Sequence, residues 1–248
     1  RRPMRFSGAD HARLALQGLL MFCLNYVLVY WAEQHVVSGL VAVVFATYTL
    51  MSLFAQRVVH GTPITVRATT GATLGVLGVA LLFLPEIAHA AQGDRDTLLG
   101  IGFALAGTLA ATLGNVVASR SQQRGLPIVS STSWSMLYGA LATAALAWAL
   151  GVRWSFDPRP AYVASLAYLT LFGTVIAFIA YLALMRKVGM ARASYIGVTT
   201  PVLALALSAT LEGYVPTLYT AAGSALVIGG NLIVLRRRRE PRRARRAS

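Results

Sequence analysis

Residues 161–185 read AYVASLAYLTLFGTVIAFIAYLALM, a run that holds no charged side chain. A helix of about 20 residues is long enough to cross the ~30 Å hydrocarbon core of a bilayer. The run does not alternate between polar and apolar residues, as the ~10-residue strands of a membrane barrel do. The stretch therefore predicts a membrane-spanning helix, which satisfies its own backbone hydrogen bonds in lipid.

Comparable apolar runs recur along the chain, separated by turn residues such as Gly61, Gly125 and Gly189. The composition agrees, because only 12% of the residues are charged, whereas soluble domains average about 25%. The sequence thus predicts an all-α, polytopic transmembrane helix bundle. Its expected spans are 13–32, 36–57, 66–85, 97–118, 130–151, 161–185, 191–211 and 217–235.

Charged residues are distributed unequally between the two sides of the expected bundle. If both termini and every second gap face the cytoplasm, 19 of the 22 arginine and lysine residues lie on that side, including the eight arginines of the tail 236–248. An excess of basic residues marks cytoplasmic loops, so the pattern predicts both termini in the cytoplasm. Topology explains the basic tail, and no basic helix with interleaved aromatic residues occurs, so we expect no nucleic-acid partner.

Two segments of the chain match when it is shifted by 152 residues. The matched residues are Thr47, Leu53, Gly61, Thr65, Gly71, Leu74 and Gly78, paired with Thr199, Leu205, Gly213, Thr217, Gly223, Leu226 and Gly230. The equivalent point recurs after five helices, which is an odd number, so the second copy is inverted relative to the first. Inverted repeats are the construction of many secondary transporters. A five-helix repeat implies ten helices in a complete unit, two more than the runs found here.

Polar and aromatic residues within the expected spans are the candidates for a solute-binding site. Uncompensated polar groups are costly in lipid, so these side chains should face the bundle interior. Hydrogen bonding between helices and contact with a solute both remain open for each of them. The candidates are Asn25, Tyr26, Tyr48, Asn115, Trp134, Tyr138, Tyr181, Tyr195 and Thr199.

Pro201 lies in the middle of an expected span. Proline removes one backbone hydrogen bond and bends a helix, which makes this residue either a hinge or a passive kink.

The sequence offers little that points to an enzyme. The four histidines are spread over separate segments without metal-ligand spacing, and no phosphate-binding glycine loop occurs. The single cysteine, Cys23, lies in an apolar run and is expected to be a small buried residue. We therefore predict no catalytic residues, no metal and no cofactor.

Several stretches resemble the EamA-type transporters of the drug/metabolite transporter superfamily. They are YWAEQHVVSGLVA (30–42), the segment 61–78, Ala193-Ser194-Tyr195, Thr199-Thr200-Pro201 and Leu211-Glu212-Gly213-Tyr214. The resemblance covers residues 12–235. In two places the chain departs from the family pattern, with Thr62 where an acidic residue is usual and Thr49 where a proline is usual.

The resemblance implies ten helices in two inverted five-helix repeats around a central cavity for small solutes. By this match, residues 1–92 hold family helices three to five, residues 93–235 hold helices six to ten, and 236–248 form the basic tail. The implied function is a secondary transporter that exports small metabolites, amino acids or drug-like compounds across the bacterial inner membrane by alternating access. A non-transporting scaffold or assembly subunit is the alternative, and pairing of two copies as a homodimer is left open.

Topology provides the first test. Reporter fusions at Asp94 and Arg124 should report opposite sides of the membrane, because one expected span separates them. The same side for both fusions would contradict the eight-span arrangement.

Overall fold

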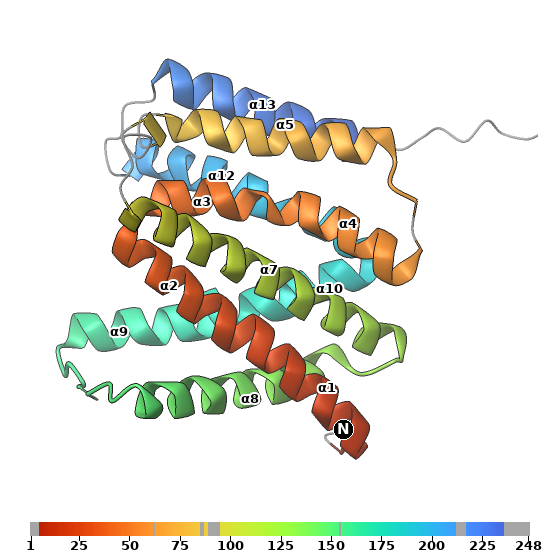
Figure 1. The fold of residues 1–248 in the computed structure, drawn as a ribbon, viewed down its shortest axis with the longest axis vertical. Coiled ribbons are helices and arrows are strands. Elements are labelled where there is room, and N and C mark those ends of the chain that lie inside the picture. The colour runs from red at the N-terminus through yellow and green to blue at the C-terminus, as the bar shows by residue number, and fades with distance from the viewer. Residues whose placement is uncertain are drawn as a thin grey trace, which may run out of the picture.

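The computed structural model describes residues 5–61, 63–84, 87–88, 95–153, 155–211 and 217–235. No strand occurs among these residues, and helices fall on every expected span, which confirms the all-α prediction (Figure 1). In the described part of the chain, the helical stretches long and apolar enough to cross a bilayer are Gly8–His35, Ser38–Val59, Arg95–Gln123 and Pro160–Val188. Two further apolar helices, Val66–Leu82 and Leu218–Val234, are shorter.

The helices follow one another along the chain with short connections. The first group is α1 (Gly8–Gly18), η1 (Leu19–Leu24), α2 (Asn25–His35), α3 (Ser38–Ala46), α4 (Tyr48–His60) and α5 (Val66–Leu82). The second group is α7 (Arg95–Gln123), α8 (Ile128–Ala149), α9 (Pro160–Tyr168), η2 (Leu169–Ile176), α10 (Ala177–Val188), α11 (Met190–Ala193), α12 (Ile196–Leu211) and α13 (Leu218–Leu235).

Two expected spans are interrupted rather than continuous. The span 36–57 breaks at Thr47, whose Oγ1 donates to Val44 O at 2.6 Å. The span 191–211 breaks after Ala193, where Ser194 Oγ donates to Ala191 O at 2.8 Å. Hydroxyl side chains that bond back to the preceding turn compete with the regular helical ladder, although Thr108 and Thr112 make similar bonds in α7 without a break.

Two long helices contain π-helical segments that the sequence did not indicate. The segment η1 joins α1 to α2, and η2 joins α9 to α10, without interrupting either helix. A π-helix bonds each N–H to the carbonyl five residues earlier, and such segments occur mostly inside α-helices at functional sites. No contrast in residue type marks them here, since both are built from the same apolar residues as the turns around them.

A stripe of small residues on α7 allows a close approach to η1 and α2. Its members are Gly100, Ala104, Gly107, Ala111, Gly114 and Ala118, and each of the three glycines lies against η1, α2 or the residue that follows α2. A Cβ atom at Gly107 would lie 3.3 Å from Asn25 O, and one at Gly114 would lie 2.9 Å from Met21 Cβ. The stripe therefore serves close helix packing, as small residues do in membrane bundles.

The helices α5 and α13 make the most extensive pairing of the described helices, side by side at one edge of the bundle (Figure 1). Their backbones touch at two places. A Cβ at Gly78 would lie 2.7 Å from Gly223 O, and a Cβ at Gly71 would lie 2.7 Å from Gly230 O. We call these four glycines the glycine seam. Side chains larger than hydrogen are excluded from it, so the seam fixes how α5 and α13 meet.

The 152-residue interval recurs in structural details beyond the matched residues. The π segments η1 and η2 end at Leu24 and Ile176, and α5 and α13 begin at Val66 and Leu218. The helix caps recur as well. Thr65 Oγ1 accepts from Ala68 N at 3.3 Å, and Thr217 Oγ1 accepts from Thr220 N at 3.2 Å. These correspondences support an internal repeat, whereas the complete ten-helix unit stays a prediction.

The glycine seam predicts a sharp contrast between two alanine substitutions. Gly78→Ala should lower the free energy of unfolding by about 1–3 kcal/mol, because its Cβ would overlap backbone atoms of α13. Gly229→Ala, on the same helix pair, meets no atom within 4 Å and should leave stability unchanged or slightly raised. Thermal unfolding in detergent measures both, and equal stability of the two variants would contradict the seam.

A candidate solute site between the two halves

The interior of the bundle holds neutral polar groups. Every polar side chain buried among the described residues is a hydroxyl or an amide. They are Gln17, Thr49, Ser52, Thr108, Thr112, Asn115, Ser121, Ser130, Ser131, Thr132, Ser135, Ser194 and Thr220. Such groups donate and accept hydrogen bonds without carrying a charge that lipid or a dry interior would penalise.

Tyr48 and Tyr181 form a hydrogen bond across the middle of the bundle. Their hydroxyl oxygens lie 2.6 Å apart, and the bond joins α4 of the first group to α10 of the second. Close by on α4, Thr49 Oγ1 donates to Ser194 O at 3.2 Å, which ties α4 to the break before α12. Two of the predicted solute-binding residues are therefore brought together from positions far apart in the sequence.

Two buried amide oxygens on other helices have no hydrogen-bond partner. They are Asn115 Oδ1 on α7 and Asn25 Oδ1 on α2. Ser52 lies one turn after Tyr48, and Asn115 lies one turn after Thr112, whose hydroxyl is 3.9 Å from Met51 Sδ on α4. An unpaired buried polar atom is costly, so these atoms are candidates to bond a solute or water.

Trp134 and Tyr138 lie elsewhere, near the start of α8. Tyr138 Oη lies 2.8 Å from His11 Nδ1, and the His11 ring packs edge-on against Trp134 with a centroid distance of 4.8 Å. This group ties α8 to α1 at the end of the bundle where both helices begin. The two residues are therefore not brought to the Tyr48–Tyr181 pair.

Tyr195 and Thr199 make hydrogen bonds between helices. Tyr195 Oη donates to Ala68 O on α5 at 2.6 Å, and Asn231 Nδ2 on α13 donates to Thr199 Oγ1 at 3.0 Å. Both bonds fasten α12 to the α5–α13 pair, which is a packing role.

The two remaining candidates lie on separate helices. Tyr26 stacks on Tyr30 along α2, with ring centroids 6.4 Å apart. Pro201 lies inside α12, where Thr200 Oγ1 donates to Ile196 O at 2.9 Å and so supports the turn before the proline.

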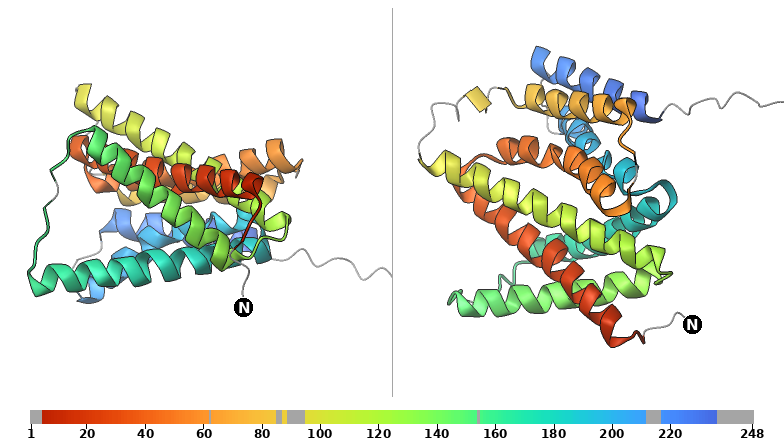
Figure 2. Two further views of the ribbon diagram at one scale, coloured as in Figure 1. Left: turned by 90° about the horizontal axis from the view of Figure 1, so that it is seen from below. Right: turned by 45° about the vertical axis from the view of Figure 1, so that its right-hand side comes forward.

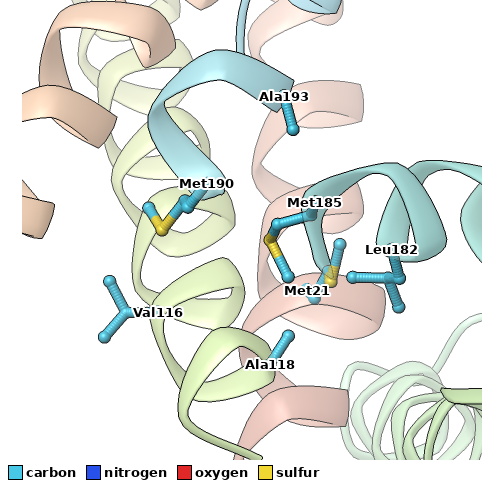
Figure 3. Packing of buried hydrophobic residues seen from close by; sticks show 7 residues of the cluster. All are labelled: Met21, Val116, Ala118, Leu182, Met185, Met190 and Ala193. Atoms are coloured by element: carbon cyan, nitrogen blue, oxygen red, sulfur yellow. The ribbon is translucent and has the colours of Figure 1, made fainter. Parts of the chain in front are cut away.

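An apolar cluster lies one turn from the tyrosine pair, where α7 and α10 end and α11 begins. It consists of Met21, Val116, Ala118, Leu182, Met185, Met190 and Ala193 (Figure 3). We call it the methionine cluster. It draws residues from η1, α7, α10 and α11, and the flexible thioethers of three methionines fill the space between these helices. Phe22 and Phe178 pack beside it with ring centroids 4.8 Å apart.

Sequence reasoning did not identify the methionine cluster. Leu182 and Met185 have the three-residue spacing of one helix face, but apolar residues occupy every face of a membrane span. His11 was likewise missed, because a lone histidine near the start of a span gives no hint of its aromatic partners on α8.

A bundle of apolar helices with neutral polar groups in its interior is consistent with a polytopic membrane protein. The chain belongs to the EamA-like transporter family, whose model matches residues 2–84 and 98–236. The resemblance noted in the sequence is thereby confirmed.

Known relatives agree with this assignment. The chain is 29% identical over 201 residues to the "uncharacterized inner membrane transporter YedA" of Escherichia coli K12, covering 80% of this chain and 62% of that protein. It is 25% identical over 223 residues to the "uncharacterized transporter YdfC" of Bacillus subtilis, covering 89% of this chain and 70% of that one. A solved crystal structure shares the fold, with a TM-score of 0.76 at 17% identity over 94% of this chain and 77% of that chain.

The tyrosine pair yields a prediction for stability. Tyr48→Phe and Tyr181→Phe should be non-additive in unfolding experiments, with a coupling energy of about 1 kcal/mol, because either change alone breaks the shared bond. Tyr48→Phe combined with Tyr195→Phe is the matched control and should be additive, since Tyr195 bonds Ala68 instead. Equal coupling in the two cycles would contradict the bond.

Proposed function

We propose that this chain forms the body of a secondary transporter that exports small metabolites, amino acids or drug-like compounds across the bacterial inner membrane. Transport proceeds by alternating access between the two halves of the bundle. Both termini face the cytoplasm, as the distribution of arginine residues predicts. The halves are residues 1–92 and 93–235, followed by the basic tail 236–248.

The observation that carries the proposal is the hydrogen bond between Tyr48 and Tyr181. It joins the two halves, and on α10 Tyr181 lies directly before Leu182 and one turn before Met185 of the methionine cluster. A solute that bonds either hydroxyl competes directly with this contact. Solute binding and separation of the halves are thereby linked, which is what alternating access requires.

The solute-binding groups are proposed to be the two tyrosine hydroxyls with Ser52 and Asn115. Each of these residues is neutral, Ser52 lies one turn after Tyr48 on α4, and Asn115 Oδ1 lacks a hydrogen-bond partner. Hydroxyl and amide groups offer both donors and acceptors, and the tyrosine rings offer apolar faces. A small amphipathic or aromatic solute without strong net charge fits this set.

One helix face supports the ten-helix arrangement. The helix α1–η1–α2 packs against α7 and α8 (Figure 2). Its repeat equivalent α9–η2 has no buried residue. By the 152-residue correspondence, a hairpin equivalent to α7–α8 would cover α9–η2. We expect the working transporter to present such a hairpin at this face.

Transport by reconstituted protein tests the proposal. Proteoliposomes should move at least one member of a labelled panel of amino acids, nucleosides and drug-like compounds. Tyr48→Phe and Tyr181→Phe should each slow that movement roughly fivefold, the effect of about 1 kcal/mol from one lost hydrogen bond. Tyr219→Phe on the exposed surface of α13 is the matched control and should transport normally.

Two results would contradict the proposal. If no compound moves, the chain is better described as a scaffold or assembly subunit. If transport occurs and both phenylalanine variants match the unchanged protein, the tyrosine pair is not part of the solute site.

A further inference from the structure

The two π-helical segments occupy equivalent positions in the chain. Leu24 and Ile176, at their ends, are 152 residues apart, and the helices that follow begin at Asn25 and Ala177. Recurrence of so infrequent a feature at the interval of the repeat indicates a shared purpose rather than an accident of packing.

Each π segment lies next to residues that hold the two halves together. Met21, inside η1, belongs to the methionine cluster, and Phe22 beside it packs against Phe178 just after η2. Beyond η2, α10 carries Tyr181, Leu182 and Met185, which lie within about two and a half turns of Ile176. A change of direction within either segment would therefore move the contacts that close this end of the bundle.

The chemistry of η2 favours such a change. Gly173 lies in the middle of the segment, and glycine weakens a helix because it has more backbone freedom to lose than other residues. Thr174 Oγ1 donates to Leu169 O at 3.1 Å, five residues earlier. The hydroxyl thus gives the Leu169 carbonyl a hydrogen bond that does not come from a backbone N–H. Bonds of this kind to the preceding turn bend helices.

We infer that η1 and η2 are paired hinges, at which the two repeat-related helices bend to open and close the methionine cluster. This inference rests on the proposed alternating-access function. Bending at η2 carries Leu182 and Met185 away from Ala118 and Met21, and breaks the bond between Tyr181 and Tyr48. The equivalent bend at η1 moves Met21 away from the methionine cluster and Phe22 away from Phe178.

Cysteine labelling can detect the opening without any knowledge of the solute. In a Cys23→Ala background, Ala118→Cys places a thiol in the methionine cluster, where the native side chain is 2% exposed. Ala72→Cys places one among residues buried beside the glycine seam, where the native side chain is 0% exposed. In the reconstituted chain, N-ethylmaleimide should label position 118 several times faster than position 72, because only the cluster opens.

Gly173→Ala then tests the hinge. The added methyl group meets only Leu169 Cδ2, at 3.7 Å, so it stiffens the segment without a clash. Labelling at position 118 should slow about threefold, as expected when alanine replaces a glycine that must leave regular helical geometry. Gly102→Ala is the matched control, because its surroundings are equally open and it lies in the regular helix α7. That control should leave the rate unchanged.

Thr174→Val provides a second variant in case Gly173→Ala does not fold. It removes the bond to Leu169 O and should also slow labelling, whereas Thr143→Val, which removes an ordinary bond to Gly139 O on α8, should not. Equal rates for hinge and control variants would overturn the hinge while leaving the proposed function intact. If position 118 labels no faster than position 72, the proposed function fails, and the hinge fails with it.

Discussion

The contact between α5 and α13 determines how the two halves of this protein meet. At the glycine seam the backbones approach so closely that a single methyl group would overlap a carbonyl oxygen. In lipid the helices gain little from the hydrophobic effect, so close packing of this kind is what holds them. The hydrogen bonds of Tyr195 and Asn231 then fasten α12 to the same pair.

The seam also relates the halves to one another. Gly71 and Gly223 are repeat equivalents, as are Gly78 and Gly230, yet the contacts join Gly71 to Gly230 and Gly78 to Gly223. An exchange of partners in this manner is the mark of a twofold-related interface. An interface of this kind allows the two halves to have different conformations while the contacts of the glycine seam are kept. The tyrosine pair and the methionine cluster involve other helices, namely α4, η1, α7, α10 and α11.

Much of the fold follows from the sequence, because a membrane helix can be recognised as a run of about 20 apolar residues without charge. The span boundaries, the close-packing stripe on α7 and the family assignment all follow from residue types and their spacing. The breaks at Thr47 and Ser194 and the segments η1 and η2 do not, since hydroxyl bonds and π geometry depend on local competition within helices of uniform apolar composition.

The candidate site was predictable only in part. Polar residues in apolar spans can be found from the sequence, but their partners cannot. Tyr48 and Tyr181 meet in the centre, whereas Tyr138 bonds His11 and Tyr195 bonds Ala68. The sequence gives no means of separating these cases, because each is a tyrosine on a membrane helix and the difference lies in which helix stands opposite.

Sidedness at two connections that precede equivalent helices tests the inverted arrangement most directly. Single cysteines in place of Val37, before α3, and Val188, at the end of α10, lie at exposed connections next to repeat-equivalent helix starts. In membrane vesicles without Cys23, a membrane-impermeant maleimide should label Val37→Cys from one side only and Val188→Cys from the other. Labelling of both positions from the same side would contradict a transporter built from two inverted halves.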